Sequence, residues 1–305
     1  MGRRMNPSPL PRLLRSLDFP WRAPPAPLSA PPGHSPERLG ADFDTDWSRR
    51  WPARMVRASM IELLWRPVVA AAAQPTRLGL DRLAALEGEP VIFAANHHSH
   101  LDTPLLMTSI PEPWRHTLIV AAAADYFFPS RPKGVASALF MGAVPVERAK
   151  VGRDSAQEVA TLVRRGWSLL LYPEGGRSTD GWGQPFRGGA AYLAHRCDVP
   201  VVPVYLAGTR RILPKGRLLP TPGRTLVVFG DPVRPDPSER IRTLGARIES
   251  AVAALADEAT TDWWQARRRV HSGQTPSLTG PDAASWRRAW ALSHRSKPRT
   301  RRWPR

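Results

Sequence analysis

The sequence predicts an α/β domain in which helices flank a mixed, mostly parallel β-sheet, between two disordered ends. Between about residues 90 and 260, apolar runs of strand length alternate with segments of helical periodicity. Such alternation is typical of a parallel sheet with helical crossovers. Polar residues directly follow several of the apolar runs, as they do where parallel strands end at a site. Residues 1–40, in contrast, contain ten prolines, which favours an extended or disordered segment.

The first predicted elements are a buried strand, a short helix and two more strands. "PVIFAAN" (90–96) is almost wholly apolar, as strands buried on both faces of a sheet are. "TPLLMTSI" (103–110) fits a short helix with Pro104 in its first turn. "TLIVAAAA" (117–124) and "MGAVPVER" (141–148) are again apolar runs of strand length.

The next three elements continue the alternation. "DSAQEVATLVRRG" (154–166) has helical spacing, and its closing glycine is a natural helix stop. "WSLLLYPEGG" (167–176) is an apolar run that leads into a glycine-bearing loop, and "GGAAYLAHRC" (188–197) fits a helix. Each of these segments is short enough to form one element of a compact domain.

Two strands and a long helix complete the predicted domain. The strands are "VPVVPVYLAG" (199–208) and "RTLVVFGDP" (224–232). The helix is expected to begin near Asp236, which suits the cap position, with Pro237 at the first helical position and Glu239 as the capping partner.

These elements divide the chain into four predicted parts. They are a Pro-rich disordered segment (1–45), an amphipathic helical segment (46–80), an α/β domain (81–262) and a basic, largely disordered tail (263–305). The most apolar stretch, residues 55–73, is interrupted by charged residues and a proline and is shorter than the about 20 apolar residues that span a bilayer. It is expected either to lie on a membrane surface or to cover the domain core.

The formal net charge is +18, and much of it lies at one end. Residues 265–305 hold eleven arginines and lysines against one aspartate. A tail of this charge attracts polyanions, either nucleic acid or an anionic lipid surface, unless it is a solvated arm. Cys197 is the sole cysteine, so no disulfide framework is expected. No apolar segment typical of a secretory signal follows the basic N-terminus.

A histidine cluster follows the first predicted strand. "HHSH" (97–100) is followed by Asp102. A neutral imidazole accepts a proton near neutral pH, and a carboxylate that holds the ring supports the charge that results. Spacing alone does not choose between His97 and His98. A metal site built from His98, His100 and Asp102 is the alternative, although no second cluster has zinc-like spacing.

Two further loops place cations and glycines at the same predicted edge of the sheet. Arg148 and Arg177 carry forked donors suited to phosphate. Gly175 and Gly176 let the backbone approach an anion closely. Glu174 could hold one of the arginines or bind a substrate hydroxyl. Together these residues favour attack by the hydroxyl of a phosphate-bearing molecule on an activated carbonyl.

Four ordered blocks resemble the motifs of the lysophospholipid and glycerolipid (PlsC-like) acyltransferases. "NHHSHLD" (96–102) resembles the family's N-H-x-x-x-x-D motif, and "GAVPVER" (142–148) its second motif. "YPEGGRS" (172–178) resembles the third, usually F-P-E-G-T-R-S, and "VPVVPV" (199–204) the fourth. "FRGGAAYLA" (186–194) is also similar to the family's segment after the third block. Tyr172 and Gly176 depart from the family's phenylalanine and threonine.

The resemblance implies roles for individual residues. His97 matches the family's general base, and Asp102 matches the group that orients it. The residues implied to bind substrate are Arg148, Glu174, Gly175, Gly176, Arg177 and Pro203. No metal, no bound cofactor and no covalent acyl-enzyme are expected.

The resemblance also implies substrates and a location. The donor is expected to be a fatty acyl thioester on coenzyme A or acyl carrier protein. The acceptor is expected to be a lysophospholipid, with 1-acylglycerol-3-phosphate giving phosphatidic acid. Alternatives are another lipid or glycerol phosphate hydroxyl, or a hydrolase that uses the same histidine and aspartate. The protein is expected to bind the cytoplasmic face of a membrane peripherally, aided by its basic tail on anionic lipids, with no nucleic acid partner.

Overall fold

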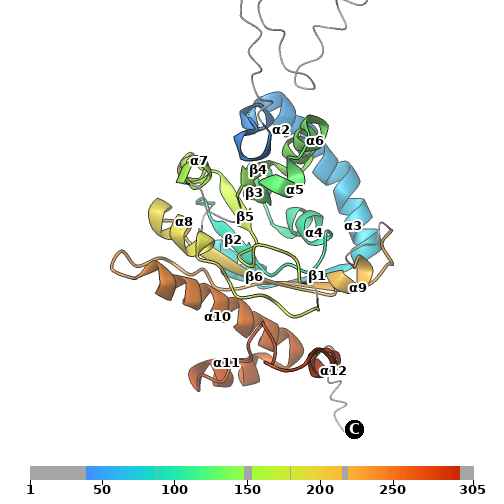
Figure 1. The fold of residues 1–305 in the computed structure, drawn as a ribbon, viewed down its shortest axis with the longest axis vertical. Coiled ribbons are helices and arrows are strands. Elements are labelled where there is room, and N and C mark those ends of the chain that lie inside the picture. The colour runs from blue at the N-terminus through green and yellow to red at the C-terminus, as the bar shows by residue number, and fades with distance from the viewer. Residues whose placement is uncertain (1–38, 87, 148–152, 179, 215–218, 296–305) are drawn as a thin grey trace, which may run out of the picture.

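The computed structural model describes residues 39–86, 88–147, 153–178, 180–214 and 219–295. A seven-stranded sheet runs through the centre of this part of the chain, with helices on both faces (Figure 1). The strands are β1 (Pro75–Leu78), β2 (Ile92–Ala95), β3 (Leu118–Ala123), β4 (Ala143–Val146), β5 (Ser168–Leu171), β6 (Val201–Ala207) and β7 (Thr225–Phe229). The α/β prediction of a mixed, mostly parallel sheet flanked by helices is confirmed.

The strand order places the predicted motifs at one edge. Across the sheet the order is β1-β7-β6-β2-β5-β3-β4, and β6 with β7 is the antiparallel pair among the described strands. The four residues of β2 are all buried, and successive side chains enter the hydrophobic clusters on opposite faces. Because β2, β3, β4 and β5 are parallel, the loops that follow them meet at one end of the sheet.

Helices cover both faces of the sheet. One face packs against α7 (Arg153–Arg164), α8 (Gly189–Cys197) and α10 (Ile241–Thr260), and the other against α3 (Arg66–Ala73), α4 (Asp102–Ser109) and the helical turn η4 (Leu80–Leu86). The α-helices are α2 (Trp51–Met60), α3 (Arg66–Ala73), α4 (Asp102–Ser109), α5 (Ala124–Phe127), α6 (Arg131–Met141), α7 (Arg153–Arg164), α8 (Gly189–Cys197), α9 (Thr209–Ile212), α10 (Ile241–Thr260), α11 (Trp263–His271) and α12 (Ser285–Arg295). Shorter helical turns are η1 (Gly40–Asp42), η2 (Asp46–Arg49), η3 (Ile61–Trp65), η4 (Leu80–Leu86) and η5 (Arg115–Thr117).

The N-terminal segment is more closely joined to the domain than the sequence suggested. Residues 1–38 lie outside the described part, but residues 39–45, expected to be disordered, fold against the body. Phe43 packs on Phe128 with ring centroids 5.3 Å apart, and a side chain at Gly134 would collide with Phe43. The α/β domain was predicted to begin at residue 81, but the sheet begins earlier in the chain, because β1 already pairs with β7.

The C-terminal predictions need two corrections. The long helix begins at Ile241, because the Asp236 carboxylate accepts the amide and hydroxyl of Ser238 at 2.8 and 2.7 Å and forms a turn instead of a cap. Much of the tail that was expected to be disordered forms α11 and α12, below α10 in Figure 1. Residues 296–305 lie outside the described part.

None of the helices in the described part is both long enough and apolar enough to cross a membrane.

Candidate active site

His97 and Asp102 form a hydrogen-bonded pair where β2 runs into α4. His97 follows the end of β2, and Asp102 is the first residue of α4. The His97 Nδ1 atom lies 2.8 Å from Asp102 Oδ2. The same oxygen accepts the backbone amides of His98 and Ser99, at 2.7 and 2.8 Å. One carboxylate therefore fixes both the loop and the ring, and leaves His97 Nε2 as the ring nitrogen able to accept a proton.

The buried carboxylate of Asp102 is held in its charged form. Burial opposes ionisation of this fully enclosed group, but the hydrogen bond and charge of His97 outweigh burial and lower the pKa of Asp102. A carboxylate that stays ionised can orient the imidazole and stabilise an imidazolium. His98 supplies a backbone amide to Asp102 but no ring contact, and burial lowers the pKa of its imidazole.

Tyr172 supports the His97 ring from the end of β5. The two rings stack with centroids 4.0 Å apart and an interplanar angle of 16°. The Tyr172 hydroxyl lies 3.1 Å from the hydroxyl of Thr103, the residue after Asp102 on α4. Burial raises the pKa of Tyr172, so the phenol stays protonated. The ring of His97 is thus held edge-on by Asp102 and face-on by Tyr172.

Glu174 lies behind His97. Its Oε1 accepts the backbone amide of His97 at 2.9 Å, and its Oε2 accepts the amide of Gln184 at 3.0 Å. The side chain is 1% exposed, and burial raises its pKa to about 7. Both carboxylate oxygens hold backbone, so this geometry makes Glu174 a group that positions the His97 loop. Its expected contact with a substrate stays a prediction.

Asn96 fixes the other side of the same loop. Its side-chain amide donates to the Leu206 carbonyl at 2.9 Å, and its carbonyl oxygen accepts the Leu206 amide at 2.7 Å. This pair of bonds joins the end of β2 to β6. The residue before His97 is therefore anchored as firmly as the residues after it.

A cavity of about 230 Å³ opens beside His97. Its lining includes His97, His100, Arg177 and Arg187, which define what we call its polar end, and one acid, Glu147. Its walls are mostly apolar and come from β3, β4, β5, α5, α6, α7 and α8; the apolar lining residues include Val120, Ala121, Ala122, Ala123, Met141, Val146, Ala156, Val159, Leu171 and Leu193. A long apolar chain could occupy the deep part while a charged group stays at the polar end.

The two glycines of the loop after β5 differ in what surrounds them. Gly175 has φ +69°, and a side chain there would meet Arg187 at 2.9 Å. Glycine is therefore needed for both the turn and the close approach of Arg187. A side chain at Gly176, where the family usually has threonine, would meet open space. The departure from the family pattern widens the cavity and strains nothing.

The structure gathers most of the predicted site residues, but not all. His97, Gly175, Gly176 and Arg177 line the cavity, with Asp102 and Glu174 directly behind them. Pro203 does not line it. It is buried within β6, where its carbonyl accepts the Gly230 amide at 2.8 Å. Arg148 lies outside the described residues, next to Glu147, which does line the cavity.

Sequence reasoning assigned no role to several residues that shape the site. Arg187 precedes α8 and stands against Gly175, and its best signal was a basic residue just before a predicted helix. Tyr172 and Thr103 act through a stack and a hydrogen bond between two elements. No local sequence pattern reports such contacts, because the partners are 69 residues apart.

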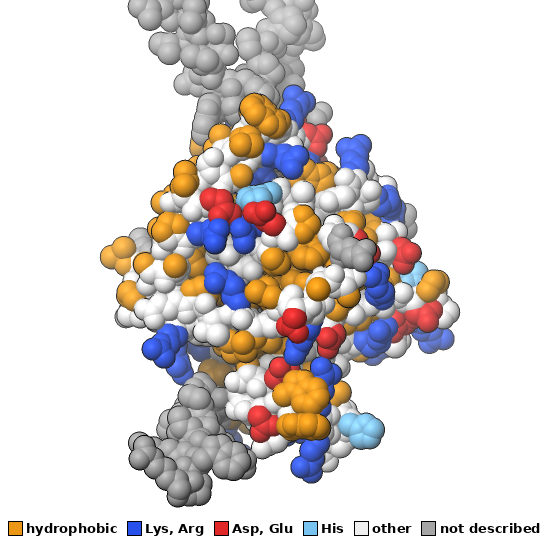
Figure 2. All heavy atoms as spheres, turned by 180° about the vertical axis from the view of Figure 1, so that it is seen from behind, with side chains coloured by type: hydrophobic (Ala, Val, Ile, Leu, Met, Phe, Trp, Pro, Cys, Tyr) orange, Lys and Arg blue, Asp and Glu red, His pale blue; other side chains and the backbone are white. Residues whose placement is uncertain are grey.

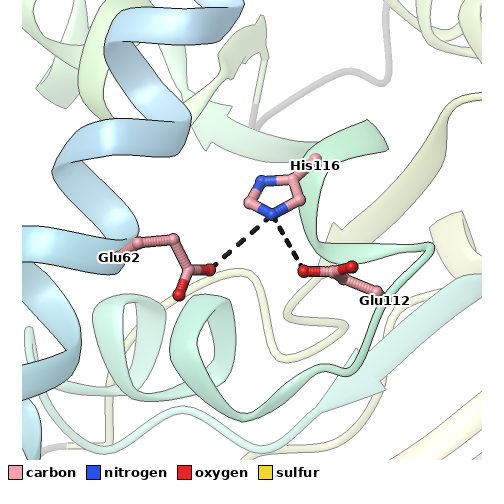
Figure 3. A group of neighbouring side chains, drawn as sticks. All are labelled: Glu62, Glu112 and His116. Atoms are coloured by element: carbon pink, nitrogen blue, oxygen red, sulfur yellow. Dashed lines mark ion pairs between the residues drawn. The ribbon is translucent and has the colours of Figure 1, made fainter.

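A second polar cluster lies away from the cavity and holds ion pairs (Figure 3). Glu62 of η3, Glu112 and His116 could by proximity share a metal ion. His116 Nε2 lies 3.6 Å from Glu62 and 3.3 Å from Glu112. Arg115 already bonds Glu62 at 3.0 Å, and Arg66 binds its other oxygen. The two arginines supply the positive charge that a cation would bring, so the cluster ties η3 to the loop before β3.

The part of the chain that lines the cavity is similar to known proteins. Residues 75–207 match the family model described as Acyltransferase. Over 140 residues the chain is 34% identical to the 1-acyl-sn-glycerol-3-phosphate acyltransferase BAT2, chloroplastic, of Brassica napus, which covers 45% of this chain and 38% of that protein. Over 122 residues it is 32% identical to 1-acyl-sn-glycerol-3-phosphate acyltransferase beta of Homo sapiens, covering 39% and 41%. The chain spans less than half the length of these relatives.

The fold resembles a solved structure as well. The crystal structure of the 1-acyl-sn-glycerophosphate (LPA) acyltransferase PlsC from Thermotoga maritima superposes with a TM-score of 0.52 at 23% identity. The match covers 68% of this chain and 80% of that chain. The two proteins therefore share their fold.

Proposed function

Since residues 75–207 match the Acyltransferase family model, we propose that this protein transfers a fatty acyl group from an acyl thioester to the hydroxyl of a lysophospholipid. The acceptor that we propose is 1-acylglycerol-3-phosphate, whose acylation gives phosphatidic acid. The observation that carries the proposal is the His97–Asp102 pair at the polar end of an apolar cavity. The relatives named as 1-acyl-sn-glycerol-3-phosphate acyltransferases support the choice of acceptor.

The proposed reaction needs one base and no covalent acyl-enzyme. His97 Nε2 takes the proton of the acceptor hydroxyl while that oxygen attacks the thioester carbonyl. The tetrahedral adduct collapses, the carbon–sulfur bond breaks, and the imidazolium returns the proton to the thiolate that leaves. Asp102, bonded to Nδ1, stabilises the imidazolium between the two steps. General-base help of this kind is worth roughly 10²–10⁴ in rate.

The two ends of the cavity suit the two parts of the substrates. Arg177 and Arg187 stand beside the open backbone at Gly175 and Gly176, where a phosphate could be held by forked donors. The apolar walls suit an acyl chain. The donor that we propose is acyl-coenzyme A or acyl carrier protein, and no bound cofactor or metal takes part.

We further propose that the protein attaches peripherally to the cytoplasmic face of a membrane, where its lipid acceptor resides. The outer surface of α2, η3 and α3 supports this, with exposed side chains that include Trp51, Leu63 and Val68. Helices with such a face lie in the interface between water and lipid. The basic tail adds attraction to anionic lipids, at about 1 kcal/mol for each arginine or lysine near the surface.

Product identification tests the function directly. The purified protein is incubated with an acyl thioester and 1-acylglycerol-3-phosphate, and the lipids are resolved by mass spectrometry. Phosphatidic acid and free thiol in equal amounts are expected. Release of free fatty acid without any acylated product would instead establish a hydrolase, and acylation of other lysolipids alone would reassign the acceptor.

Arg177→Ala is expected to raise KM for 1-acylglycerol-3-phosphate roughly tenfold, because a charge-assisted phosphate contact is worth about 1.5–3 kcal/mol. KM for the acyl donor should change less than twofold. Arg165→Ala removes the same charge from an exposed position after α7 and should leave both constants unchanged. With a monoacylglycerol acceptor, which has no phosphate, KM should be the same for Arg177→Ala and wild type. Equal changes in both constants would contradict the phosphate assignment.

Ala121→Leu is expected to shift the preferred acyl chain to a shorter one. Ala121 lies on β3 in the wall of the cavity, so three added carbons would fill space that the chain end occupies. Competition between acyl thioesters of different lengths, read by mass spectrometry, measures the shift. Ala246→Leu on the exposed face of α10 is the control. An unchanged length profile in Ala121→Leu would place the acyl chain elsewhere.

A further inference from the structure

Helix α12 exposes tryptophan side chains on one side and contacts the loop behind the active site on the other. Trp286 and Trp290 are 65% and 64% exposed and lie four residues apart, which places them on one face of the helix. Arg287 is exposed beside them, with its guanidinium 5.1 Å from the Trp286 ring centroid. At the lower end of the molecule in Figure 2, where α11 lies, large hydrophobic side chains stand beside Lys, Arg and acidic side chains.

Tryptophan together with arginine suits one partner in particular, an anionic bilayer. Tryptophan is enriched at the boundary between headgroups and acyl chains, because its ring is apolar and its N–H is polar. The composition of this end of the sequence is complementary to anionic lipid, since residues 265–305 hold eleven basic residues against one acid. Helix α11 adds Trp264, 73% exposed, among further arginines.

The opposite side of α12 contacts residues 180–184, the segment that follows the Glu174 loop. Arg288 bonds the Asp180 carboxylate through Nη2 at 2.7 Å and through Nε at 2.8 Å. The Trp182 indole N–H donates to the Arg288 carbonyl at 2.9 Å. Trp182 is itself 6% exposed, and Gly280 approaches its ring so closely that any side chain there would collide.

Residues 180–184 are connected to His97 by two short chains of hydrogen bonds. The Gln184 amide donates to Glu174, and Glu174 in turn accepts the amide of His97. The Gly181 amide donates to the Ser178 hydroxyl at 2.7 Å, and the Ser178 amide donates to the His97 carbonyl at 3.0 Å. A displacement of α12 would therefore be transmitted to both the backbone amide and the backbone carbonyl of His97.

We propose that α12 docks on an anionic bilayer through Trp286 and Trp290, and that its Arg288 side holds residues 180–184 so that this docking supports the geometry of His97. The proposal rests on the proposed function only in that the bilayer is the one that holds the lipid acceptor. Arg288 is a positioning residue: it touches Asp180, and nothing places it in the cavity.

Vesicle binding by the 305-residue chain tests the docking surface. Vesicles of phosphatidylglycerol with phosphatidylcholine are compared with phosphatidylcholine alone in a sedimentation assay. Trp286→Ala/Trp290→Ala is expected to bind the anionic vesicles about tenfold more weakly, because two interfacial anchors are lost. Leu219→Ala, which removes an 82% exposed side chain outside α12, is the control. Wild-type binding by the double variant, or equal binding of wild type to both vesicles, would overturn the docking surface.

Neighbouring arginines test the coupling to the active site. Arg287→Ala and Arg288→Ala remove the same charge from the same helix, but only Arg288 holds Asp180. With substrate dispersed in detergent, Arg288→Ala is expected to lower kcat about tenfold with both KM values unchanged, and Arg287→Ala to change kcat less than twofold. Arg288→Lys should recover part of the loss. Asp180→Asn should add little to Arg288→Ala, since both break one contact. Equal kcat values in the two arginine variants would overturn the coupling.

Amide hydrogen exchange separates this inference from the proposed reaction. Without substrate, exchange across residues 180–184 should be faster in Arg288→Ala than in wild type and unchanged in Arg287→Ala. If the wild-type protein made no phosphatidic acid, the proposed function would fail, and exchange and vesicle binding would still decide the inference. Unchanged exchange in Arg288→Ala would overturn it whatever the activity.

Discussion

His97→Ala is expected to lower kcat for acyl transfer by roughly 10³-fold, because a positioned general base contributes about 10²–10⁴ in rate. KM for either substrate should change little, since the imidazole acts on a proton that moves in the transition state. Initial rates of thiol release and phosphatidic acid formation over a range of both substrates measure the effect. Because the ring also stacks on Tyr172, circular dichroism is needed to show that the variant is folded.

His98→Ala is the matched control for this prediction. It removes the same side chain one position along the loop, and its contact with Asp102 is made by the backbone amide, which alanine keeps. The His98 side chain does not line the cavity. A loss of no more than about threefold is therefore expected. A large loss in His98→Ala combined with near-wild-type turnover in His97→Ala would exchange their roles and remove the proposed mechanism.

The positions of the strands could be predicted because burial leaves a local trace. Each of the six predicted strands contains an observed one, and "IFAA" of β2 is apolar because it is covered on both faces. The edge strand β1 was missed for the opposite reason. It pairs on one side only, three of its four residues are exposed, and so "PTRL" carries no apolar run.

The sequence predicted where the site lies in the fold better than it predicted how the side chains of the site are arranged. Parallel topology brings the loops after the neighbouring strands β2 and β5 together, so the polar residues after these two strands lie close to one another. The direction of each side chain depends on contacts distant in sequence. Glu174 turns toward two backbone amides and Pro203 stays within β6, which motif position does not reveal.

The C-terminal helices show the same limit at the level of the fold. None of the residues of α12 whose burial is described, 285–292, is buried. It is held by Arg288 on Asp180 and by Trp182 on the Arg288 carbonyl, partners more than 100 residues apart. Hydrophobic periodicity reports on burial along one element, and it cannot detect an element that is fixed by a few polar contacts.

Glu174→Gln is expected to lower kcat by roughly 10²-fold although Glu174 does not line the cavity, since a displacement of about 1 Å at a catalytic group can cost this much. Glutamine keeps one acceptor oxygen but turns an NH₂ group toward the amide of His97 or of Gln184. One buried amide then lacks its acceptor, which costs about 1–3 kcal/mol. Glu249→Gln makes the same chemical change nearby, where its charge but no bond acts on Glu174, and should leave kcat within twofold.

The same variant should also change how stability depends on pH. Burial raises the pKa of Glu174 to about 7 from its ordinary value of 4.5, so between these values the folded chain keeps a proton that the unfolded chain has released. The free energy of unfolding therefore falls as pH rises through this window and is flat with respect to this group above it. At about 1.4 kcal/mol per pKa unit, the fall is roughly 3 kcal/mol. Glutamine does not titrate, so urea unfolding of Glu174→Gln from pH 4.5 to 7.5 should lack this fall, while Glu249→Gln keeps it. A parallel pH dependence in Glu174→Gln and wild type would mean that Glu174 is already ionised at low pH, held by its two amide donors against the effect of burial.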